Sequence, residues 1–532
     1  MLLILRFITR FSRFFFVSTA CANANLPAMT PRPQSPDSQP VTDSTKNTAT
    51  SLRKRPLASP KSTTGKAKKD SPIHESLTED KYRFTPERDT WNGKYEFGGP
   101  IGALGFIVFS HFIMYYLWAC ICFFDGEAVY PGHAKLQGKP FWSTFMAAIA
   151  ERAAPTAWTF GVFSAFLFFE YALAVVLPGP VTYGLPLASE GGRRLAYKCN
   201  AVSAWYIQLA VIIALEYTGI FSLAQVADNF GRFMTAAVIW GDVVSVIVYI
   251  WGFATNRAFR NSGNHLYDFF MGSMLNPRLP GDVDLKLVAE LRNSWALLFY
   301  LTAASAVQMY RDTGYITTNM ALLALAQFLY TNACQKGEEC VPTTWDIHYE
   351  KFGWMLVFWN FAGVPFVYCF QSLFIKQVVP TLNYGPFHTA FLLVFILTVY
   401  WIWDTVNSQK NRFRMKRQGV DEAIIRRKTF PQLPWGYIED PHTLKSDRGE
   451  LFVDGWYKYA RKMHYTADMC MSFYWGYCCG VTHFIPFFYF CFFFSHLIHR
   501  VQRDEERCAE KYGPLWKQYV KEVPYRFIPG VF

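Results

Sequence analysis

"IGALGFIVFSHFIMYYLWACICFF", residues 101–124, contains no Asp, Glu, Lys or Arg and is followed by a polar loop. About 20 consecutive apolar residues in a helix span the hydrocarbon core of a bilayer, so this run is long enough to cross one. Comparable runs recur to the end of the chain, about ten in all, and the last two are short enough to form one tight hairpin. The runs lie near 101–124, 156–178, 201–221, 232–254, 294–310, 316–333, 353–375, 388–403, 468–482 and 484–498. They predict an all-α integral membrane protein with about ten transmembrane helices.

The composition supports a membrane protein. Hydrophobic residues make up 52% of the 532 residues and aromatic residues 18%, which exceeds what the core of a soluble domain needs. The 12 cysteines lie mostly inside the apolar runs and form no CxxC pair. We therefore predict that they are small core residues, and that they form neither a disulfide framework nor a zinc site.

Positive charge gathers in two segments outside the apolar runs. Residues 1–90 carry 15 Lys and Arg against 8 Asp and Glu, and residues 404–462 carry 13 against 8. Eight predicted spans separate the two segments, so both face the same side, and a final hairpin returns the tail from Arg500 to that side. Because Lys and Arg collect in cytoplasmic loops, the N-terminus, the long loop and the C-terminus are predicted to be cytosolic.

The first 90 residues differ from the rest of the chain. An Arg- and Phe-rich start, which lacks acidic residues, is compatible with a secretory signal, with an organellar transit peptide or with translation that begins at Met29. The stretch that follows is rich in Pro, Ser, Thr and Lys and predicts a disordered basic region. This region is either a solvated cytosolic extension or a segment attracted to anionic lipid headgroups.

A first candidate site lies between residues 336 and 371. Asp346 and Glu350 are four residues apart and would share one face if the segment were helical, with Tyr349 beside them. Helix capping and interfacial anchoring would explain the same residues. Pro365 is expected to kink the following span and free a backbone carbonyl, which would help to form a cavity.

A second candidate site is the basic loop after the span at 388–403. Lys410 and Arg414 share a helical face, and Arg461 and His464 precede Asp468 at the start of an apolar run. Guanidinium and ammonium groups at a membrane edge suit a phosphorylated ligand. Topology alone also places Lys and Arg beside a cytosolic membrane face, so the cluster has a second explanation.

The tail "RDEERCAEKYGPLWKQYVKEVPYRFIPGVF", residues 503–532, mixes aromatic residues with charges of both signs and is predicted to be folded. Asp504, Arg507 and Lys511 recur at helical spacing and would form one face that holds a polar cofactor. Trp516 and Tyr525 would then pack against the bundle. The alternative is a surface helix with intrahelical ion pairs.

Several familiar motifs are missing from the sequence. No GxGxxG follows a strand and no P-loop is present, so a nucleotide site here would be of neither the Rossmann nor the Walker type. His496 and His499 lie on an aromatic run, where paired histidines are usually structural. No metal site is therefore predicted.

From Glu96 to Phe532 the chain resembles the membrane sterol reductases, the group that includes the Δ14- and Δ7-sterol reductases and the lamin B receptor. The resemblance rests on three distant motifs, namely "DIHYEKFGWMLVFWNFAGVPFVYC", "NSQKNRFR" and the tail. Within this family it is most similar to the C-24(28) sterol reductases, through "YEFGGPIGALGF", "NAVSAWY", "DFFMGSMLNPR", "FLYTNACQKGEE" and "LFVDGWYKYARKMHYTADM". This implies NADPH-dependent reduction of a sterol side-chain double bond, the last step of ergosterol synthesis, by a multi-pass protein among the lipids of the endoplasmic reticulum membrane.

The resemblance also implies the cofactor site, a cytosolic cap formed by residues of about 404–532 within one reductase domain at 91–532. Two positions depart from the family pattern, because Phe452 and Tyr457 stand where relatives tend to have Leu and Trp. Met274 stands where this subfamily often has Glu, which argues against an acid-dependent role there. The implied NADPH contacts are Lys410, Arg414, Phe452, Tyr457, His464, Tyr465, Asp504, Cys508, Lys511, Tyr512 and Tyr519.

An isolated C=C bond offers hydride no electron sink, so the reaction also needs a positioned acid. Asp468, beside the predicted cofactor cluster, is the first candidate for the proton donor, and Asp346, Tyr349 and Glu350 follow it. Burial would keep such a carboxyl protonated near neutral pH.

Other functions remain open from the sequence. Δ14- or Δ7-sterol reduction would use the same family features. A membrane methyltransferase of the isoprenylcysteine type would use S-adenosylmethionine, and a scaffold like the lamin B receptor would use the basic N-terminus to bind partners. The predicted partners are a sterol and membrane lipids, without nucleic acid. The sequence leaves the preferred sterol and the oligomeric state open.

Overall fold

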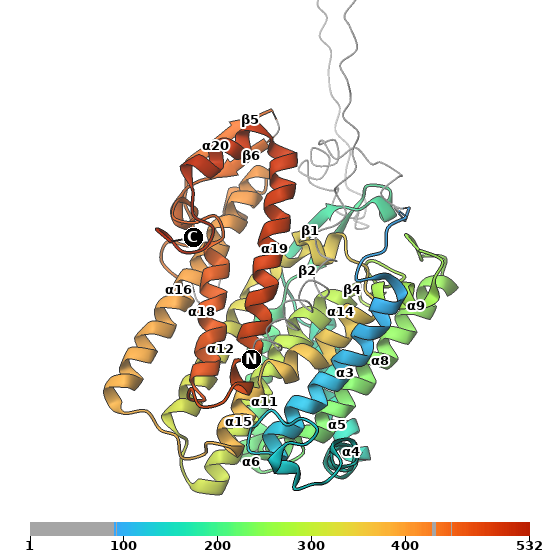
Figure 1. Cartoon of the computed structure of the whole chain (residues 1–532). Coiled ribbons are helices and arrows are strands. Elements are labelled where there is room, and N and C mark those ends of the chain that lie inside the picture. Colours follow the sequence, from blue (N-terminus) through green and yellow to red (C-terminus); the bar gives the residue numbers. More distant parts are fainter. Residues whose placement is uncertain (1–89, 92, 428–431, 448, 532) are drawn as a thin grey trace, which may run out of the picture.

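The computed structural model describes residues 90–91, 93–427, 432–447 and 449–531 (Figure 1). The predictions made for residues 1–89, including the targeting segment, the start at Met29 and the disordered basic region, lie outside the described residues.

Helices dominate the structure, and six segments in the described part of the chain are long and apolar enough to cross a membrane. They are α3 (Gly99–Phe123), α5 (Ala157–Val176), α6 (Ala201–Thr218), α8 (Phe230–Ala254), the continuous segment Trp354–Gln377 and α16 (Pro386–Arg417). The other four predicted runs also form helices, namely α11 (Leu297–Thr313), α12 (Thr318–Lys336), α18 (Met463–Tyr477) and α19 (Phe488–Tyr512). The chain is thus a multi-pass membrane protein, while the predicted number of ten spans stays a prediction.

Two of the helical runs contain π-helical turns. In the first, α10 (Leu285–Val288) continues through η5 (Ala289–Ala296) into α11, and in the second, α14 (Trp354–Phe358) continues through η7 (Trp359–Val367) to α15 (Phe370–Gln377). Pro365 lies inside η7 and has no N–H for the α-helical ladder, so the disturbance predicted there takes the form of a π-helix. The two π-helical turns pack against each other in the centre of the bundle. Such turns often occur at functional sites.

Three two-stranded antiparallel hairpins, which an all-α prediction missed, connect the helices. They pair β1 (Val181–Pro186) with β2 (Arg194–Lys198), β3 (Arg278–Leu279) with β4 (Val283–Asp284), and β5 (Thr443–Ser446) with β6 (Gly449–Phe452). The remaining short elements are η3 (Ala134–Leu136), α4 (Phe141–Arg152), η4 (Ala188–Glu190), α7 (Ala224–Asp228), α9 (His265–Met271), η6 (Gly337–Thr343), α13 (Trp345–His348), α17 (Glu422–Ile425), η8 (Gly455–Lys458), η9 (Ile485–Phe487) and α20 (Pro514–Glu522).

A close backbone contact fixes the loop between α13 and α14. Gly272 has φ +100°, and a Cβ atom there would lie 2.5 Å from the backbone N of Gly353. Next to this contact, the backbone N–H of Phe352 donates to the carbonyl of Met274 at 2.7 Å. Only glycine permits such an approach, so the pair holds the segment that carries Glu350 against the end of α9.

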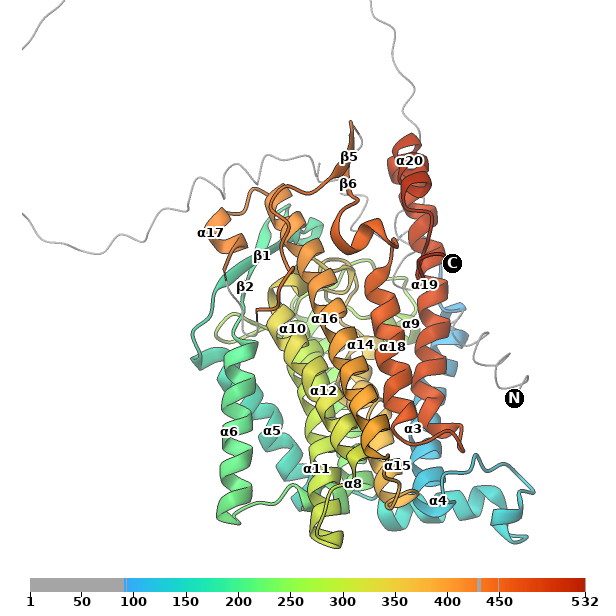
Figure 2. The ribbon, with the colours of Figure 1, turned by 90° about the vertical axis from the view of Figure 1, so that its left-hand side faces the viewer.

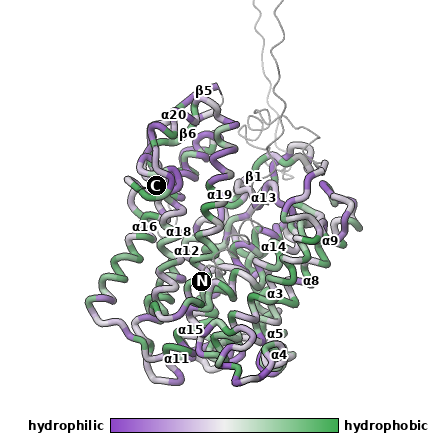
Figure 3. Tube along the Cα trace, viewed as in Figure 1, coloured by the Kyte–Doolittle hydropathy of each residue, from purple (hydrophilic) through white to green (hydrophobic). Residues whose placement is uncertain are grey.

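The ends of the bundle differ in composition. Figures 1 and 2 show the start of α3, the loop with α17, β5 and β6, and the terminal helix α20 at one end, with α4 at the other. Hydrophobic residues predominate along the helices of the bundle, whereas α20 and the adjoining end of α19 are largely hydrophilic (Figure 3). The start of the first span, the basic loop and the tail therefore share one end, as the charge pattern predicted. The predicted final hairpin is formed by α18 and α19, which pack against each other.

Candidate active site

The basic loop and the tail meet where α16, α18 and α19 converge. Lys410 on α16 places its Nζ 5.3 Å from the centre of the Tyr457 ring, and the Tyr457 hydroxyl lies 3.5 Å from Nδ1 of His464. The ring of Phe452 contacts Tyr457 edge to face at 5.4 Å. His464 packs on Tyr465 at 4.1 Å. The structure therefore brings Lys410 of α16 together with four of the predicted cofactor residues from the segment 452–465.

Asp504 joins this group through an ion pair with Lys462. Burial alone would raise the pKa of Asp504, but the charges of Lys462, Lys410 and Arg500 outweigh it and lower the pKa to about 2. The Cys508 thiol lies 3.9 Å from Oδ2 of the same carboxylate, one helical turn further along α19. Asp504 is thus a fixed negative charge among cations.

The imidazole of His464 is neutral, unlike the charged side chains of Lys410, Lys462 and Asp504 around it. Its burial, together with the neighbouring charges of Lys410 and Lys462, lowers the pKa of the imidazole well below its usual value. A neutral ring next to Tyr465 offers a flat surface and a hydrogen-bonding nitrogen, without adding to the positive charge around it.

The tail folds onto the β5–β6 hairpin. Leu444 of β5 forms a small apolar cluster with Trp516 and Tyr519 of α20, and Cys508 and Tyr512 pack against it. The prediction that Trp516 packs against the bundle is therefore wrong, because this cluster covers the ring. Phe527 makes the contact instead, in a cluster with Met469 of α18 and with Leu497 and Val501 of α19.

Other predicted features of the tail lie at its edge. Lys511 is exposed, and its Nζ lies 5.0 Å from the centre of the Tyr512 ring. Arg414 is exposed near the end of α16. The side chains of Arg507, His496 and His499 lie outside the described part of the structure.

A second ion pair, between Arg461 and Glu505, adjoins the Lys462–Asp504 pair but faces the end of the tail. The Arg461 guanidinium bonds Glu505 at 2.8 Å and donates to the carbonyls of Val523 and Pro524 at 2.6 and 2.8 Å. Arg526 pairs with the other oxygen of Glu505 at 2.8 Å. This pair holds the end of the tail against α19. The sequence analysis did not identify Glu505 or Arg526, because their role depends on a contact across more than 20 residues.

The carboxylates predicted at 346 and 350 form part of a buried charge cluster. Helix α13 ends at His348, so Glu350 is not on the helical face of Asp346 as predicted. The two carboxyls still influence each other, together with Lys286 of α10. Glu350 accepts a hydrogen bond from Nε1 of Trp345 at 2.7 Å, and Lys286 donates to its backbone carbonyl at 2.7 Å.

Burial shifts the titration of this cluster. It raises the pKa of the Glu350 carboxyl to about 7 and lowers the pKa of Lys286 to about 8. Glu290, on the adjacent π-helical turn, also interacts with Asp346 and was missed by the sequence analysis. Glu290 could have been predicted as a site residue because it is an acidic residue close to the predicted span at 294–310.

Tyr349 does not join the carboxylates. Its ring stacks on Trp345 at 4.1 Å, the Arg260 guanidinium lies 4.3 Å from its centre, and Arg260 also donates to its carbonyl. Met274 lies in an apolar cluster with Phe352, which is consistent with the absence of an acid at that position.

Asp468 lies inside the bundle on α18. Its Oδ1 has no hydrogen-bond partner among the described residues. Cys334, on α12, is close enough for the charge of an Asp468 carboxylate to act on its thiol.

Arg500 on α19 connects the two groups. Its charge interacts with Tyr465 and Asp504 on one side and with Asp346 and Glu290 on the other. It forms no ion pair with a carboxylate in the part of the chain that the structure describes. From the sequence, Arg500 was predicted only to mark the point where the tail returns to the side of the basic loop. Its position one turn before Asp504, at the end of the aromatic run, could have indicated a role in the site.

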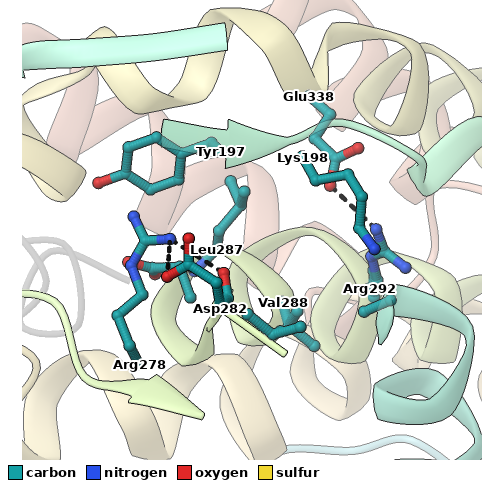
Figure 4. A pocket seen from close by; sticks show the side chains of 11 residues that line it. Tyr197, Lys198, Arg278, Asp282, Leu287, Val288, Arg292 and Glu338 are labelled. Carbon is teal, nitrogen blue, oxygen red and sulfur yellow. Dashed lines mark hydrogen bonds and ion pairs between the residues drawn. The ribbon is translucent and has the colours of Figure 1, made fainter. Parts of the chain in front are cut away.

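A separate pocket lies between β2, β4 and η5, where Arg292 pairs with Glu338 at 3.1 Å (Figure 4). Arg278 and Asp282 form its other polar wall. None of the predicted site residues lines this pocket.

Comparison with known proteins identifies relatives over most of the chain. The family described as "Ergosterol biosynthesis ERG4/ERG24 family" matches residues 92–532. A protein of Aspergillus fumigatus named Delta(24(24(1)))-sterol reductase erg4A is 40% identical over 447 residues, which cover 82% of this chain and 93% of that protein. A Delta(24(24(1)))-sterol reductase of Gibberella zeae is 40% identical over 83% of this chain and 74% of its own length. A Delta(14)-sterol reductase of Methylotuvimicrobium alcaliphilum is 31% identical over 86% of this chain and all of its own length.

Proposed function

Because the chain belongs to the ergosterol biosynthesis ERG4/ERG24 family and is a sterol reductase, we propose that it reduces the C24(28) side-chain double bond of a sterol with NADPH. The two fungal relatives support this choice of bond over the nuclear double bonds, since they are more similar to the chain than the Δ14-reductase is. The family match leaves the methyltransferase alternative without support.

The observation that carries the proposal is the ion pair of Lys462 with Asp504, beside which Lys410 and Arg500 lie close enough to lower the pKa of the same carboxyl. This group has more positive than negative charge, which suits the phosphates of a dinucleotide. Arg500 lies in the interior without a pairing carboxylate among the described residues, as expected of a side chain that meets an anionic ligand. The tail, with Cys508, Lys511, Tyr512 and Tyr519, would cap the site, and residues of about 404–532 would form its cofactor-binding part.

Ring faces and charges have separate roles in this proposal. Lys410 and Arg414 would hold phosphate groups, and Tyr457, His464 and Tyr465 would pack against a flat ring, with Phe452 behind Tyr457. When bound, NADPH supplies the hydride.

The proton would come from Asp468, whose Oδ1 lacks a hydrogen-bond partner within the described residues. Apolar and aromatic neighbours favour the protonated form of such a carboxyl. Asp346 and Glu350 are the alternative donors, and burial raises the pKa of the Glu350 carboxyl to about 7, so that it can hold a proton near neutral pH. Tyr349 is the weakest donor candidate, because its ring faces Arg260.

We further infer a location in the endoplasmic reticulum membrane with both termini cytosolic. The positive-inside rule and the common position of the basic loop and the tail at one end of the bundle support this orientation (Figure 2).

The decisive experiment is a sterol profile of cells that lack the gene, with and without re-expression of the chain. We expect sterols with a 24(28) double bond to accumulate, and re-expression to remove them. Accumulation of Δ14 or Δ7 sterols would instead assign the chain to another reaction of the family.

A further inference from the structure

Four aromatic side chains form a surface patch where the basic loop packs against α16. We name them the aromatic patch: Trp401 of α16, Trp435 of the basic loop, Trp456 of η8, and Tyr459 just after η8. The ring of Trp435 lies 4.8 Å from Trp456 and 6.2 Å from Trp401, and Trp456 lies 6.3 Å from Tyr459. Trp435 is 39% exposed and Tyr459 43% exposed. The patch is therefore part of the molecular surface and not of the core.

A stripe of exposed apolar residues on α16 leads to the patch. Phe387, Phe391 and Val394 are exposed at a spacing of three and four residues, which places them on one face, and Trp401 follows two turns after Val394. Residues 386–403 contain no Asp, Glu, Lys or Arg. As a helix they extend for about 27 Å, close to the thickness of the hydrocarbon core. Trp401 therefore lies close to the point where α16 leaves the hydrocarbon.

Hydrogen bonds hold the rest of the patch against α16 at this level. Nε1 of Trp401 donates to the carbonyl of Pro434 at 3.0 Å, and Nε1 of Trp456 donates to Oγ1 of Thr405 at 2.8 Å. One turn further along α16, the side-chain oxygen of the buried Gln409 accepts from the backbone N–H of Trp456 at 3.0 Å. The patch thus has a fixed position relative to the span.

The backbone at Trp435 is strained. Its φ is +70°, a left-handed conformation that bulky L-residues rarely adopt and that glycine adopts freely. Nε2 of Gln409 donates to the carbonyl of Trp435 at 2.7 Å and stabilises this conformation. The loop therefore carries a large exposed ring at a position where its backbone favours glycine, which indicates a function for the ring.

The exposed rings have free polar atoms. Nε1 of Trp435 and the hydroxyl of Tyr459 have no hydrogen-bond partner among the described residues. Lys458 is exposed, its Nζ lies 5.1 Å from the centre of the Tyr459 ring, and it forms no ion pair within the described ranges. Trp and Tyr rings with a free polar atom are typical of the membrane interface, where the ring meets acyl chains and the polar atom meets headgroups. A neighbouring ammonium group suits the phosphate of a phospholipid.

Tyr457 lies on the opposite side of the same short element. It is 3% exposed and points toward Lys410 and Phe452 of the candidate cofactor site, whereas Trp456 belongs to the patch. Through η8, the surface patch is thus joined to the candidate site.

We propose that the aromatic patch binds the phospholipid headgroup region of the leaflet on the side of the basic loop, and that this contact holds η8 and Tyr457 in position. Continuity with the lipid-facing stripe of α16 and the free polar atoms of the rings favour a phospholipid over water or a protein partner. The lipid contact does not depend on the proposed function, whereas its effect on NADPH rests on it.

Photo-crosslinking tests the lipid contact. The photoreactive amino acid p-benzoylphenylalanine replaces Trp435 or Tyr459, one at a time, in the full-length protein in phosphatidylcholine nanodiscs. The same replacement at Phe391 is the control within the hydrocarbon, and that at Lys517, exposed on α20, is the control outside the membrane. Mass spectrometry of the peptides after irradiation gives the fraction that carries lipid. We expect this fraction at both patch positions to lie within about threefold of that at Phe391 and at least about tenfold above that at Lys517.

Two results would overturn the lipid contact. One is lipid on Phe391 but on neither patch position, which would leave the patch in water or on a protein. The other is as much lipid on Lys517 as on the patch. Trp435 and Tyr459 report independently, so one of them suffices if the other variant fails to accumulate.

Binding of NADPH in the same nanodiscs tests the effect on η8. Trp435→Asp introduces a charge at the headgroup boundary and should raise the Kd for NADPH at least about threefold, whereas Trp435→Tyr keeps a ring with a polar atom and should retain the wild-type Kd. Backbone strain alone predicts the opposite order, because Asp adopts a positive φ more readily than Tyr.

Equal Kd values for the two variants would overturn the role of the patch in holding η8. A wild-type protein that does not bind NADPH would instead contradict the proposed function, and the crosslinking result would still decide the lipid contact.

Discussion

Two ion pairs on the tail helix, adjacent in sequence, illustrate two uses of the same chemistry. We call Arg461–Glu505 the outer pair because it faces the end of the tail, and Lys462–Asp504 the inner pair because it faces the cations, although the outer pair is the more buried of the two. Both join the same two segments. Consecutive residues on an α-helix point about 100° apart, so Asp504 and Glu505 face different surroundings. The outer pair is completed by Arg526 and by two backbone carbonyls, whereas the inner pair lies among further cations.

The difference lies in what remains for a ligand. Most hydrogen-bonding groups of the outer pair are used within the protein, so it stabilises the fold. The inner pair shares its carboxylate with Lys410 and Arg500 and leaves an excess of positive charge. An ion pair whose hydrogen-bonding groups are satisfied within the protein stabilises the fold. An ion pair that leaves an excess of charge can instead contribute to a binding site.

The largest expected effect comes from removal of the outer pair. Arg461→Ala would leave Glu505 and the carbonyls of Val523 and Pro524 without their donor in a nearly buried position. Breaking a buried ion pair costs about 3–5 kcal/mol, so little folded protein should remain in the membrane. The measurement is the amount and the thermal unfolding temperature of the protein extracted from microsomes.

The control for this variant is Arg526→Ala, which removes the exposed partner of the same carboxylate. Exposed ion pairs contribute only about 0–1 kcal/mol, so the unfolding temperature should change little. A loss as large as that of Arg461→Ala would show that the outer pair is not a distinct, buried contact.

Removal of the inner charge should separate activity from folding. Asp504→Asn deletes a partly exposed carboxylate, and we expect normal accumulation but a loss of reductase activity and of NADPH affinity by about tenfold to a hundredfold. Tyr519→Phe should act in the same direction if its hydroxyl contacts the cofactor. Microsomal turnover per unit of protein and NADPH binding check both variants, and wild-type values would reduce the inner pair to a surface contact.

A smaller effect is expected from the cations at the edge of the inner group. Lys410→Ala combined with Arg414→Ala should raise the KM for NADPH about tenfold more than the KM for NADH, provided that these side chains contact the 2′-phosphate. An equal change for the two cofactors would assign both residues to general anchoring.

The smallest effect concerns the buried carboxyl of Glu350. Because burial raises the pKa of Glu350 to about 7, its contribution to stability is complete below the pKa of the unfolded chain, near 4.5, and is lost as the pH rises toward 7. In Glu350→Gln the unfolding temperature should therefore fall less between pH 5 and pH 7.5, by about 2–4 °C. Asp504→Asn should not alter that pH dependence, since the pKa of Asp504 is about 2.

The apolar pattern alone predicted the helices well. All ten predicted runs are helical, and the basic loop and the tail share one end of the bundle, because hydrophobic length and charge bias are local properties of the chain. The hairpins were missed, since two- to six-residue strands at helix ends leave no periodic signal. The prediction that Asp346 and Glu350 share a helical face was wrong because α13 ends at His348, two residues before Glu350.

The candidate site was only partly visible in the sequence. Resemblance to a family identified Lys410, Asp504 and Tyr457 before their contacts were known, but it gave no role to Arg500 or Glu290. Their roles depend on the fold, because the charge of Arg500 acts both on Asp504 and on the cluster of Asp346 and Glu290, which separate segments contribute.

The sequence by itself determined that this chain crosses a membrane, which end carries the basic loop and the tail, and which family it belongs to. These properties depend on composition, run length and local motifs, which the chain carries before it folds. Only the tertiary structure decided which of two neighbouring carboxylates supports the tail and which faces the cations. The physical reason is that the energy of a buried charge or ring depends on its partners within a few ångströms, and those partners come from distant parts of the chain.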